Sequence, residues 1–292
     1  MKIIDPATTP TSVLHQYMLG AVAPRPIAFV STVNQAGETN LAPFSFFNAF
    51  SSNPPIVVFS ANRRVANNTT KDTLANVEAT RECVINMVSY DIVRQMAIAS
   101  VEFDSKTSEF DKSGLTPIAS DLVRPPRVAE SHIQMECRVE QILPLGEHGG
   151  AGFLILCHIV RMHINQDILD QNDRIDPHKL DLVGRMGRTF YNRASGESIF
   201  SLHQSVTQIV IGFDQLPTHL RHSPILTGSE ISRLANLTAP PDPTEIATFR
   251  ASDTRLADII TTPDPIPALH AYIREAIATE DIPRAALLAW SL

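Results

Sequence analysis

Cysteine is scarce in this sequence, and its scarcity excludes a disulfide-rich secreted domain. Only Cys83, Cys137 and Cys157 occur, an odd number at wide spacings, whereas disulfide frameworks use an even number of closely spaced cysteines. Each cysteine lies in an apolar run that is typical of a strand. We therefore expect three buried free thiols and predict neither disulfides, metal ligands nor a cysteine nucleophile.

Positive charge is also in deficit, since 24 Lys and Arg stand against 31 Asp and Glu, for a net charge of -7. Nucleic-acid binding needs a basic face, so no nucleic-acid partner is expected. No apolar run approaches the roughly 20 residues of a membrane-spanning helix. The start, MKIIDPATTP, lacks the apolar core of a signal peptide. We expect a cytoplasmic protein with no membrane partner.

Several well-known motifs are missing as well. No G-x-G-x-x-G follows a strand and no G-x-x-x-x-G-K-S/T occurs, so neither a dinucleotide-binding fold nor a P-loop is indicated. No G-x-S-x-G occurs either, which leaves no nucleophile elbow for a serine hydrolase. His163, Asn165 and Asp167 alternate along the chain without metal-ligand geometry, so no metal site is predicted.

The patterns that are present predict a mainly β protein with peripheral helices. Helices are expected at 12–20 and 71–80. Along 132–143, Ile133 and Met135 are expected to face inward and Gln134 and Glu136 outward. Buried or alternating apolar runs predict strands at 27–33, 39–47, 56–60, 83–89, 132–143 and 151–164. A barrel of antiparallel strands interrupted by a few helices is the natural way to close such a set.

The sequence pattern changes beyond about residue 205, where frequent prolines separate short segments. Residues 268–278, ALHAYIREAIA, place apolar side chains on one face of a predicted amphipathic helix. These side chains are Leu269, Tyr272, Ile273, Ala276 and Ile277. We therefore predict one domain over 1–204 and an extension over 205–292 that packs on the barrel or on a second subunit.

Residues 40–55, NLAPFSFFNAFSSNPP, combine aromatic side chains, three of them at Phe46, Phe47 and Phe50, with small polar ones. The stretch starts as an alternating strand and loses the alternation at Phe46. Such a segment suits a flat polar ring laid along a strand, with backbone N–H groups reading the edge of the ring. A core strand that runs into a proline-rich loop is the alternative interpretation.

A second polar group surrounds the predicted start of the helix at 71–80. Its members are Ser60, Asn62, Arg63, Arg64, Lys71, Asp72 and Thr73. A helix N-terminus favours a phosphate through its unpaired N–H groups and its dipole. Lys71 and one arginine would supply the compensating charge, and Asp72 would cap the helix or bind a ribityl hydroxyl. An ordinary capped surface helix is the alternative.

Five sequence blocks, taken together and in their order along the chain, resemble the flavin reductase-like family of FMN-binding split-barrel proteins, which are usually homodimers. The resemblance covers about residues 10–200. It implies an FMN-binding split barrel with Greek-key-like antiparallel strands, a helical C-terminal extension found in one branch, and a homodimer. The blocks are RPIAFVST (25–32), N-x-APFSFFN (40–48), PPIVVFS (54–60), KDT-x-x-N (71–76) and CVINMV (83–88).

The resemblance also implies FMN as the cofactor and assigns residues to its parts. The isoalloxazine ring is expected along Phe44, Ser45, Phe46, Phe47 and Asn48. The phosphate is expected at Ser60, Asn62, Arg63 or Arg64, and Lys71 with Thr73; Asp72 and Asn76 are further cofactor-binding candidates. Hydride transfer to a flavin needs no protein acid or base, so no catalytic residue is assigned.

On the substrate side the candidates are His132, Arg185, Arg188 and Tyr191. His132 opens a strand and is also the weak candidate for a catalytic donor; a satisfied histidine is the alternative. The other three follow the last predicted barrel strand, where they would close over the flavin or a nicotinamide phosphate. An exposed basic loop explains them equally well.

The function implied is an FMN-dependent oxidoreductase in which NAD(P)H reduces the bound flavin and electrons pass to free flavin or another acceptor. Two alternatives stay open. In the first, residues 205–292 cover the flavin and the protein is a dedicated reductase, oxidase or oxygenase of a small organic substrate. In the second, the protein is a non-catalytic flavin-binding carrier.

Overall fold

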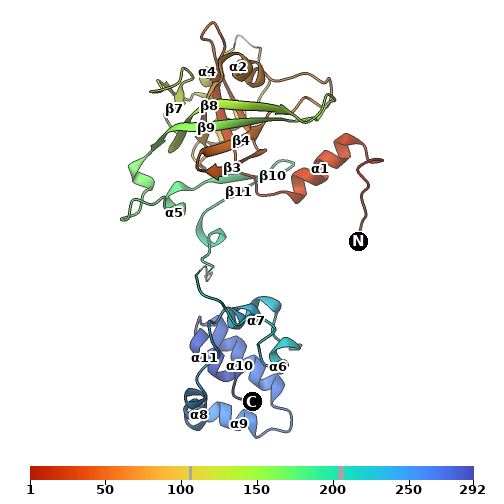
Figure 1. Ribbon diagram of the computed structural model, residues 1–292, viewed down its shortest axis with the longest axis vertical. Helices are drawn as coiled ribbons and strands as arrows, with labels where there is room; N and C mark the ends of the chain where they lie inside the picture. Colours follow the sequence, from red (N-terminus) through yellow and green to blue (C-terminus); the bar gives the residue numbers. More distant parts are fainter. Residues whose placement is uncertain (105–106, 203–206) are drawn as a thin grey trace. The chain divides into compact units, whose positions relative to one another are not determined.

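A computed structural model describes residues 1–104, 107–202 and 207–292. The chain divides into two compact units, Met1–Phe200 and Ser201–Leu292, which are drawn in Figure 1. The predicted boundary between residues 204 and 205 lies outside the described residues. Packing of the extension on the barrel or on a second subunit stays a prediction, and so does the homodimer.

The first unit is built on one seven-stranded antiparallel sheet with the order β2-β1-β5-β8-β9-β4-β3. In Figure 1 the long strands β8 and β9 cross the front of this sheet. The predicted mainly β, antiparallel class is therefore confirmed. The strands are β1 Ala28–Val33, β2 Thr39–Phe44, β3 Phe47–Ser52, β4 Pro55–Ser60, β5 Glu82–Met87, β8 Ile133–Pro144 and β9 Phe153–Ile164.

The turn between β2 and β3 closes the sheet into a barrel. The sequence predicts one strand over 39–47, but the chain bends at Ser45 and Phe46 and continues as β3. β2 and β3 form the two opposite edges of the sheet. Three Cα steps, from Phe44 to Phe47, span at most about 11 Å. The sheet must therefore roll up until its edges meet at this corner.

Shorter elements border the barrel. The helices are α1 Thr11–Ala21, α2 Asp72–Thr80, α3 Val93–Ile98, α4 Glu109–Ser113 and α5 Pro177–Leu180, with single 3-10 turns at Gln166–Ile168 and Gly196–Ser198. Two small hairpins pair β6 Pro117–Ile118 with β7 Arg127–Val128, and β10 Val183–Gly187 with β11 Phe190–Arg193. The predicted helices at 12–20 and 71–80 are confirmed as α1 and α2.

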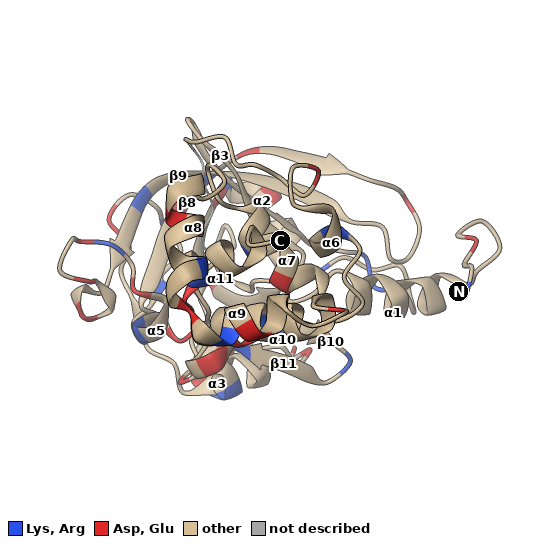
Figure 2. Ribbon diagram, turned by 90° about the horizontal axis from the view of Figure 1, so that it is seen from below, with Lys and Arg blue, Asp and Glu red and all other residues tan. Residues whose placement is uncertain are grey.

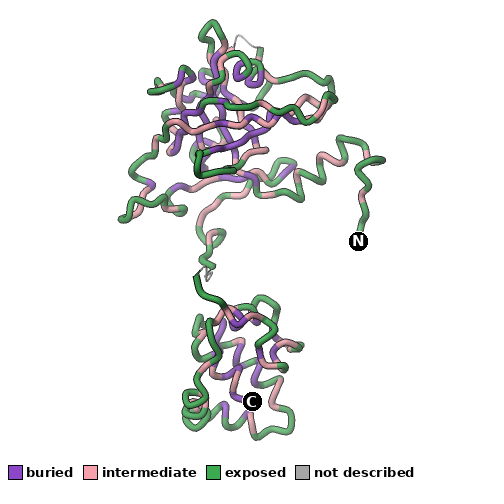
Figure 3. The backbone as a smooth tube through the Cα atoms, in the orientation of Figure 1, coloured by how far each residue is buried: buried purple, intermediate pink, exposed green. Residues whose placement is uncertain are grey.

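The barrel interior is apolar and holds all three cysteines as buried free thiols, as predicted. Cys83 Sγ lies 3.8 Å from Cys157 Sγ. Hydrogen bonding to Cys83, and then burial, raise the pKa of the Cys137 thiol. Burial, and then hydrogen bonding to Cys83, raise the pKa of the Cys157 thiol. Figure 3 shows the buried backbone concentrated in these strands.

One prediction along β8 is wrong. Ile133 and Met135 face the interior as expected, but Gln134 and Glu136 are also buried, with 6% and 0% of their surface exposed. The irregular segment before β8 covers this face of the sheet. Its backbone N–H groups at 121 and 122 donate to Glu136 at 2.8 and 2.7 Å. A buried carboxylate is tolerated there because it is fully hydrogen-bonded.

In the described residues of the second unit, all the regular secondary structure is helical. α10 buries the five apolar side chains that the sequence places on one face, so the amphipathic helix is confirmed, and they pack in the core of their own unit. Several of the prolines that divide this region occupy the first turn of a helix, where a missing N–H is harmless. The helices are α6 Thr218–Arg221, α7 Gly228–Ala235, α8 Pro243–Ser252, α9 Thr254–Ile260, α10 Ile266–Ala278 and α11 Ile282–Ala289.

Charge is distributed without a long run of one sign. Figure 2 shows Lys and Arg interspersed with Asp and Glu along the ribbon. Within the described part of the chain, no helix combines the length and the apolar character that crossing a membrane requires. The cytoplasmic location and the absence of nucleic-acid and membrane partners stay predictions.

Candidate functional site

A cavity of about 460 Å³ lies in the first unit at the corner where β2 passes into β3. Its walls come from the C-terminal end of α1, the segment before β1, the turn at Ser45, and the facing ends of β4 and β9. Six residues predicted to bind the cofactor line it. They are Ser45, Phe46, Phe47, Asn48, Ser60 and Asn62.

Strand pairing holds this corner in place. The Ser60 N–H donates to the Phe46 carbonyl at 2.8 Å, and Phe47 pairs with Phe59 across β3 and β4. Phe44 does not line the cavity. It is buried in the barrel with its ring 5.1 Å from that of Phe59, so it packs behind Phe59, which lines the cavity.

The polar end of the cavity depends on a glycine. Ser60 Oγ donates to Asn62 Oδ1 at 2.8 Å, and Asn62 Nδ2 donates to the Gly150 carbonyl at 3.2 Å. A Cβ at Gly152 would lie 2.5 Å from Ser60 Oγ and 3.2 Å from Asn62 Oδ1. Any larger residue at 152 would fill the space that this polar pair now occupies.

Arg25 is a cavity residue that the sequence reasoning missed. It lines the cavity although only 4% of its surface is exposed. Its Nη1 donates to the Leu19 carbonyl at 2.5 Å and to the Val22 carbonyl, and its Nε lies 3.4 Å from Ser45 Oγ. Nη2 has no hydrogen-bond partner among the residues that the structure describes. A lone arginine between two prolines, shortly before a mostly apolar strand, is the signal that was available.

Lys71 forms a second cationic centre beside the ring of Phe44, 5.0 Å from its centroid. Burial, and then the nearby charge of Arg64, lower the pKa of Lys71, while Glu102 opposes them. Arg64 is paired with Glu102 at 2.5 Å. Lys71 has no carboxylate within ion-pair distance in the described ranges. A half-buried cation next to another cation is a natural place for an anion.

The other predicted phosphate residues are placed elsewhere. Thr73 is buried and its Oγ1 accepts from Asn40 at 2.9 Å, while buried Asn76 donates to Thr32 at 3.0 Å. Asp72 is exposed, begins α2 without capping it, and borders a separate hollow of about 160 Å³ with Asn76. Arg63 stacks 5.2 Å from the Phe153 ring. Thr73 and Asn76 pack α2 against β1 and β2, and their role toward a cofactor stays a prediction.

The substrate-side candidates do not line this cavity. His132 borders a different one, of about 420 Å³, together with His163. On the β10–β11 hairpin the Arg185 guanidinium lies 4.5 Å from the Tyr191 ring, and Arg185 Nη2 donates to the Arg188 carbonyl at 2.5 Å. The structure thus groups these three residues with one another.

One cluster in the described residues has the spacing of metal ligands, namely Asp121, Glu136 and His163. Glu136 accepts from His163 Nε2 at 2.7 Å in addition to two backbone N–H groups, and Asp121 pairs with Arg161 at 2.5 Å. Burial raises the pKa of Glu136, but these hydrogen bonds outweigh burial and lower it overall. The atoms that could bind a metal already have hydrogen-bond or ion-pair partners, so we interpret the cluster as an ion-pair network.

Comparison with known proteins identifies the first unit. The family described as "Flavin reductase like domain" matches residues 19–179. This chain belongs to the flavin reductase-like family. A protein of Aquifex aeolicus, named "Uncharacterized protein", is 38% identical over 184 residues, which are 63% of this chain and 91% of that protein. The resemblance seen in the five sequence blocks is confirmed.

Solved structures of flavin reductase-like proteins agree. Nitrilotriacetate monooxygenase component B from Bacillus cereus is 30% identical with a TM-score of 0.64, over 69% of this chain and 98% of that chain. 2-Nitrobenzoate 2-nitroreductase from Pseudomonas fluorescens is 25% identical with a TM-score of 0.62, over 72% of this chain and 100% of that chain. The split-barrel fold is therefore confirmed, and a flavin-linked oxidoreductase is the functional class.

The cavity residues fit a flavin. The volume of about 460 Å³ falls in the usual range of about 300–1,000 Å³ for small-molecule sites. Phe46 and Phe47 offer apolar walls, and Ser45, Asn48 and Asn62 offer polar atoms. Arg25 Nη2 is a buried donor that a ring carbonyl or ring nitrogen would satisfy.

Proposed function

We propose that this protein is an FMN-dependent oxidoreductase that takes hydride from NAD(P)H and passes electrons to free flavin or another acceptor. One observation carries the proposal. The cavity at the β2–β3 corner of a flavin reductase-like barrel combines the predicted ring-binding segment with a buried, incompletely hydrogen-bonded cation. A planar, electron-accepting ring with polar edges matches such a cavity in shape and charge.

The ring would lie against Ser45, Phe46 and Phe47. Its polar edge would meet Asn48 and the side chain of Arg25. Bound FMN would supply the redox chemistry, namely acceptance of a hydride (two electrons and one proton) from NAD(P)H and return of two electrons to the acceptor. The protein has to bind, orient and shield the ring, and this requires no general acid or base.

A predicted site for one phosphate group favours FMN, which carries one phosphate, over FAD, which carries two. Lys71 and Arg64 form a cationic centre that could compensate the charge of one phosphate, although neither residue lines the cavity. Ser60 and Asn62 add polar groups at the end of the cavity. A charge-assisted contact to phosphate is stronger than a neutral hydrogen bond. We infer that this centre holds the end of the ribityl phosphate chain.

The test is to purify the protein, record its absorbance, titrate it with FMN and follow the oxidation of NADH and NADPH. We expect a yellow protein, or a colourless one that binds FMN with quenching of flavin fluorescence. We also expect oxidation of at least one nicotinamide donor that depends on FMN. A colourless protein that does not bind added FMN would refute the proposal.

A dedicated enzyme for a small organic substrate is the second candidate. The cavity mouth is unusually apolar, since Met18, Val22 and Phe50 are 48%, 61% and 69% exposed and all three line it. The nitroreductase relative is named for an aromatic substrate. Rapid turnover of excess free FMN by NAD(P)H would favour the flavin reductase. Bound flavin that no nicotinamide or protein donor reduces would favour the carrier.

A further inference from the structure

Arg25 has more hydrogen-bond donors than the protein satisfies. A guanidinium carries five N–H groups. Two on Nη1 serve the carbonyls of Leu19 and Val22, and the Nε group faces Ser45 Oγ at 3.4 Å. The two on Nη2 have no partner in the described residues. A buried polar group without a partner is unfavourable and rare, so this nitrogen is explained best by a partner that binds later.

The positive charge of Arg25 is also uncompensated. Arg25 takes part in none of the ion pairs among the described residues. The charge that acts on it most clearly is another cation, Arg185. Burial, and then Arg185, lower the pKa of Arg25. Its guanidinium remains charged because an arginine pKa starts above about 12.

The guanidinium is held in place from three sides. Its bonds to the carbonyls of Leu19 and Val22 fix it at the C-terminal end of α1, where a cation is favoured. The backbone of Arg25 exchanges hydrogen bonds of 3.0 and 2.8 Å with Arg185 in β10. Gly187 lets β10 approach closely, since a Cβ there would lie 3.0 Å from the Leu19 carbonyl oxygen. Arg25 is therefore fixed before any ligand arrives.

We propose that Arg25 tunes the bound flavin, because its fixed positive charge stabilises the reduced, negatively charged ring more than the oxidised, neutral ring. The inference rests on the proposed function and adds a residue to it. A charge in a water-excluded site acts more strongly than one in solvent and needs no rearrangement when the ring is reduced. The two unpaired N–H groups of Nη2 would donate stronger hydrogen bonds to a negatively charged ring than to a neutral one.

The test compares Arg25→Gln and Arg25→Lys with the wild-type protein, and measures the affinity for oxidised FMN and the midpoint potential of the bound flavin. In Arg25→Gln we expect the preference for reduced over oxidised FMN to fall about tenfold, which is about 30 mV for a two-electron couple. Arg25→Lys keeps most of the preference near neutral pH. Arg124→Gln, which removes an exposed arginine paired with Glu82, is the matched control and leaves the potential unchanged.

The outcomes separate the two proposals. A wild-type protein without FMN affinity overturns the proposed function. A wild-type protein that binds FMN, with the same potential in Arg25→Gln, overturns the role of Arg25, because a purely structural arginine would weaken both redox states equally. If Arg25→Gln does not fold, the pH series of Arg25→Lys decides. Its potential must fall below that of wild type as the pH rises and the buried lysine loses its charge. Curves that stay parallel up to pH ~11, above the unperturbed lysine pKa of about 10.4, refute the role.

Discussion

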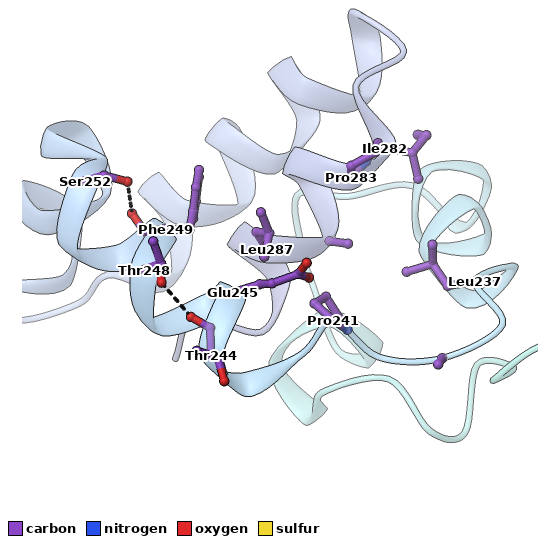
Figure 4. A pocket seen from close by; sticks show the side chains of 12 residues that line it. Leu237, Pro241, Thr244, Glu245, Thr248, Phe249, Ser252, Ile282, Pro283 and Leu287 are labelled. Atoms are coloured by element: carbon purple, nitrogen blue, oxygen red, sulfur yellow. Dashed lines mark hydrogen bonds between the residues drawn. The ribbon is translucent and has the colours of Figure 1, made fainter.

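The cavity of the first unit and a groove of the second unit differ in size and in whether their lining includes a buried polar atom without a hydrogen-bond partner. The groove, between α8 and α11, measures about 800 Å³ and is mostly apolar. Figure 4 shows two of its hydroxyl groups turned back to their own helix, where Thr248 donates to the Thr244 carbonyl at 2.8 Å and Ser252 to the Phe249 carbonyl at 3.1 Å. None of its lining residues, all of them described, has a buried polar atom without a partner.

The smaller cavity contains the buried guanidinium with free donors. Apolar volume alone is a poor guide to a binding site, because helices that pack imperfectly leave grooves of this kind. A buried cation without a partner is rarer, since the protein bears its unfavourable free energy in the absence of a ligand. The comparison therefore assigns function to the first unit on chemistry and leaves the groove without an assignment.

Two histidines of the second unit show this contrast, because they satisfy each other's hydrogen bonds. Arg221 Nε of this unit is also buried without a partner among the described residues, but Arg221 does not line the groove. His219 Nε2–H donates to the Ala289 carbonyl at 3.1 Å, so its Nδ1 must accept from His270 Nε2–H at 3.0 Å. His270 Nδ1 then accepts from the Ser223 hydroxyl at 2.8 Å. Each ring carries one proton and each proton has a partner. The network stabilises a fold and offers nothing to a ligand.

Filling the cavity gives the largest effect that we predict. Ser45→Tyr places a ring in the space at the β2–β3 corner, and we expect FMN affinity to fall at least about 100-fold, or about 2.7 kcal/mol. Titration of flavin fluorescence measures it. Thr248→Tyr, which adds the same bulk to the groove of the second unit, should leave FMN affinity unchanged. A Ser45→Tyr protein that still copurifies with FMN would move the ring elsewhere.

Mild acid should destabilise the second unit. Burial lowers the pKa of His219, and burial and then His219 lower the pKa of His270. The unfolded chain then binds more protons, so the stability is complete above the unfolded value of about 6.5 and is lost as the pH falls below it. Between pH ~7.5 and ~5.5 the unfolding constant rises up to about 100-fold, because two protons are taken up at about 1.4 kcal/mol per pH unit each.

The single tryptophan, Trp290, packs against the core of the second unit, so its fluorescence during denaturant unfolding reports on this unit. His222→Gln removes an exposed histidine of the same unit and is the matched control; its pH profile should follow wild type. A tryptophan transition with the same midpoint at both pH values would contradict the role of the network.

Removing the second cationic centre should have an intermediate effect. Lys71→Ala loses a charge-assisted contact to phosphate, and we expect FMN to bind more weakly by about 1–3 kcal/mol. The loss should shrink at high salt because part of it is electrostatic. Arg255→Ala, which breaks an exposed ion pair with Glu275 in the second unit, is the control. An unchanged FMN affinity in Lys71→Ala would place the phosphate at another site.

The sequence predicts the parts of the fold and site that depend on local pattern. The strands 27–33 and 132–143 and the face of α10 follow from hydrophobic periodicity. Ser45 to Asn48 reach the cavity because they are contiguous in the chain. The bend at Ser45 is not visible in the sequence, since the alternation is lost only at Phe46 and the apolar run continues to Phe47. Glu136 is misplaced because its burial depends on a separate irregular segment.

Arg25 shows why the rest of the site could not be predicted from the sequence. Its role depends on carbonyls three and six residues earlier, on Ser45 twenty residues later, and on a backbone pairing with Arg185. No periodicity links these positions. Thr73 illustrates a contact that the sequence does not show. It stands at a helix start, where a phosphate ligand is predicted, and its hydroxyl accepts from Asn40. Only the packing of α2 on the sheet reveals this contact.

The smallest predicted effect compares one glycine of each unit. At Gly152 a Cβ would meet Ser60 Oγ at 2.5 Å, whereas at Gly228, the first residue of α7, it would meet nothing within 4 Å. Gly152→Ala should lower the free energy of unfolding by about 1–2 kcal/mol through overpacking, and weaken FMN several-fold by displacing Ser60. Gly228→Ala should raise stability by about 0.5–1 kcal/mol through reduced backbone entropy of the unfolded chain. Denaturant titration of both variants measures the difference, and equal effects would mean that close approach at Gly152 does not shape the cavity.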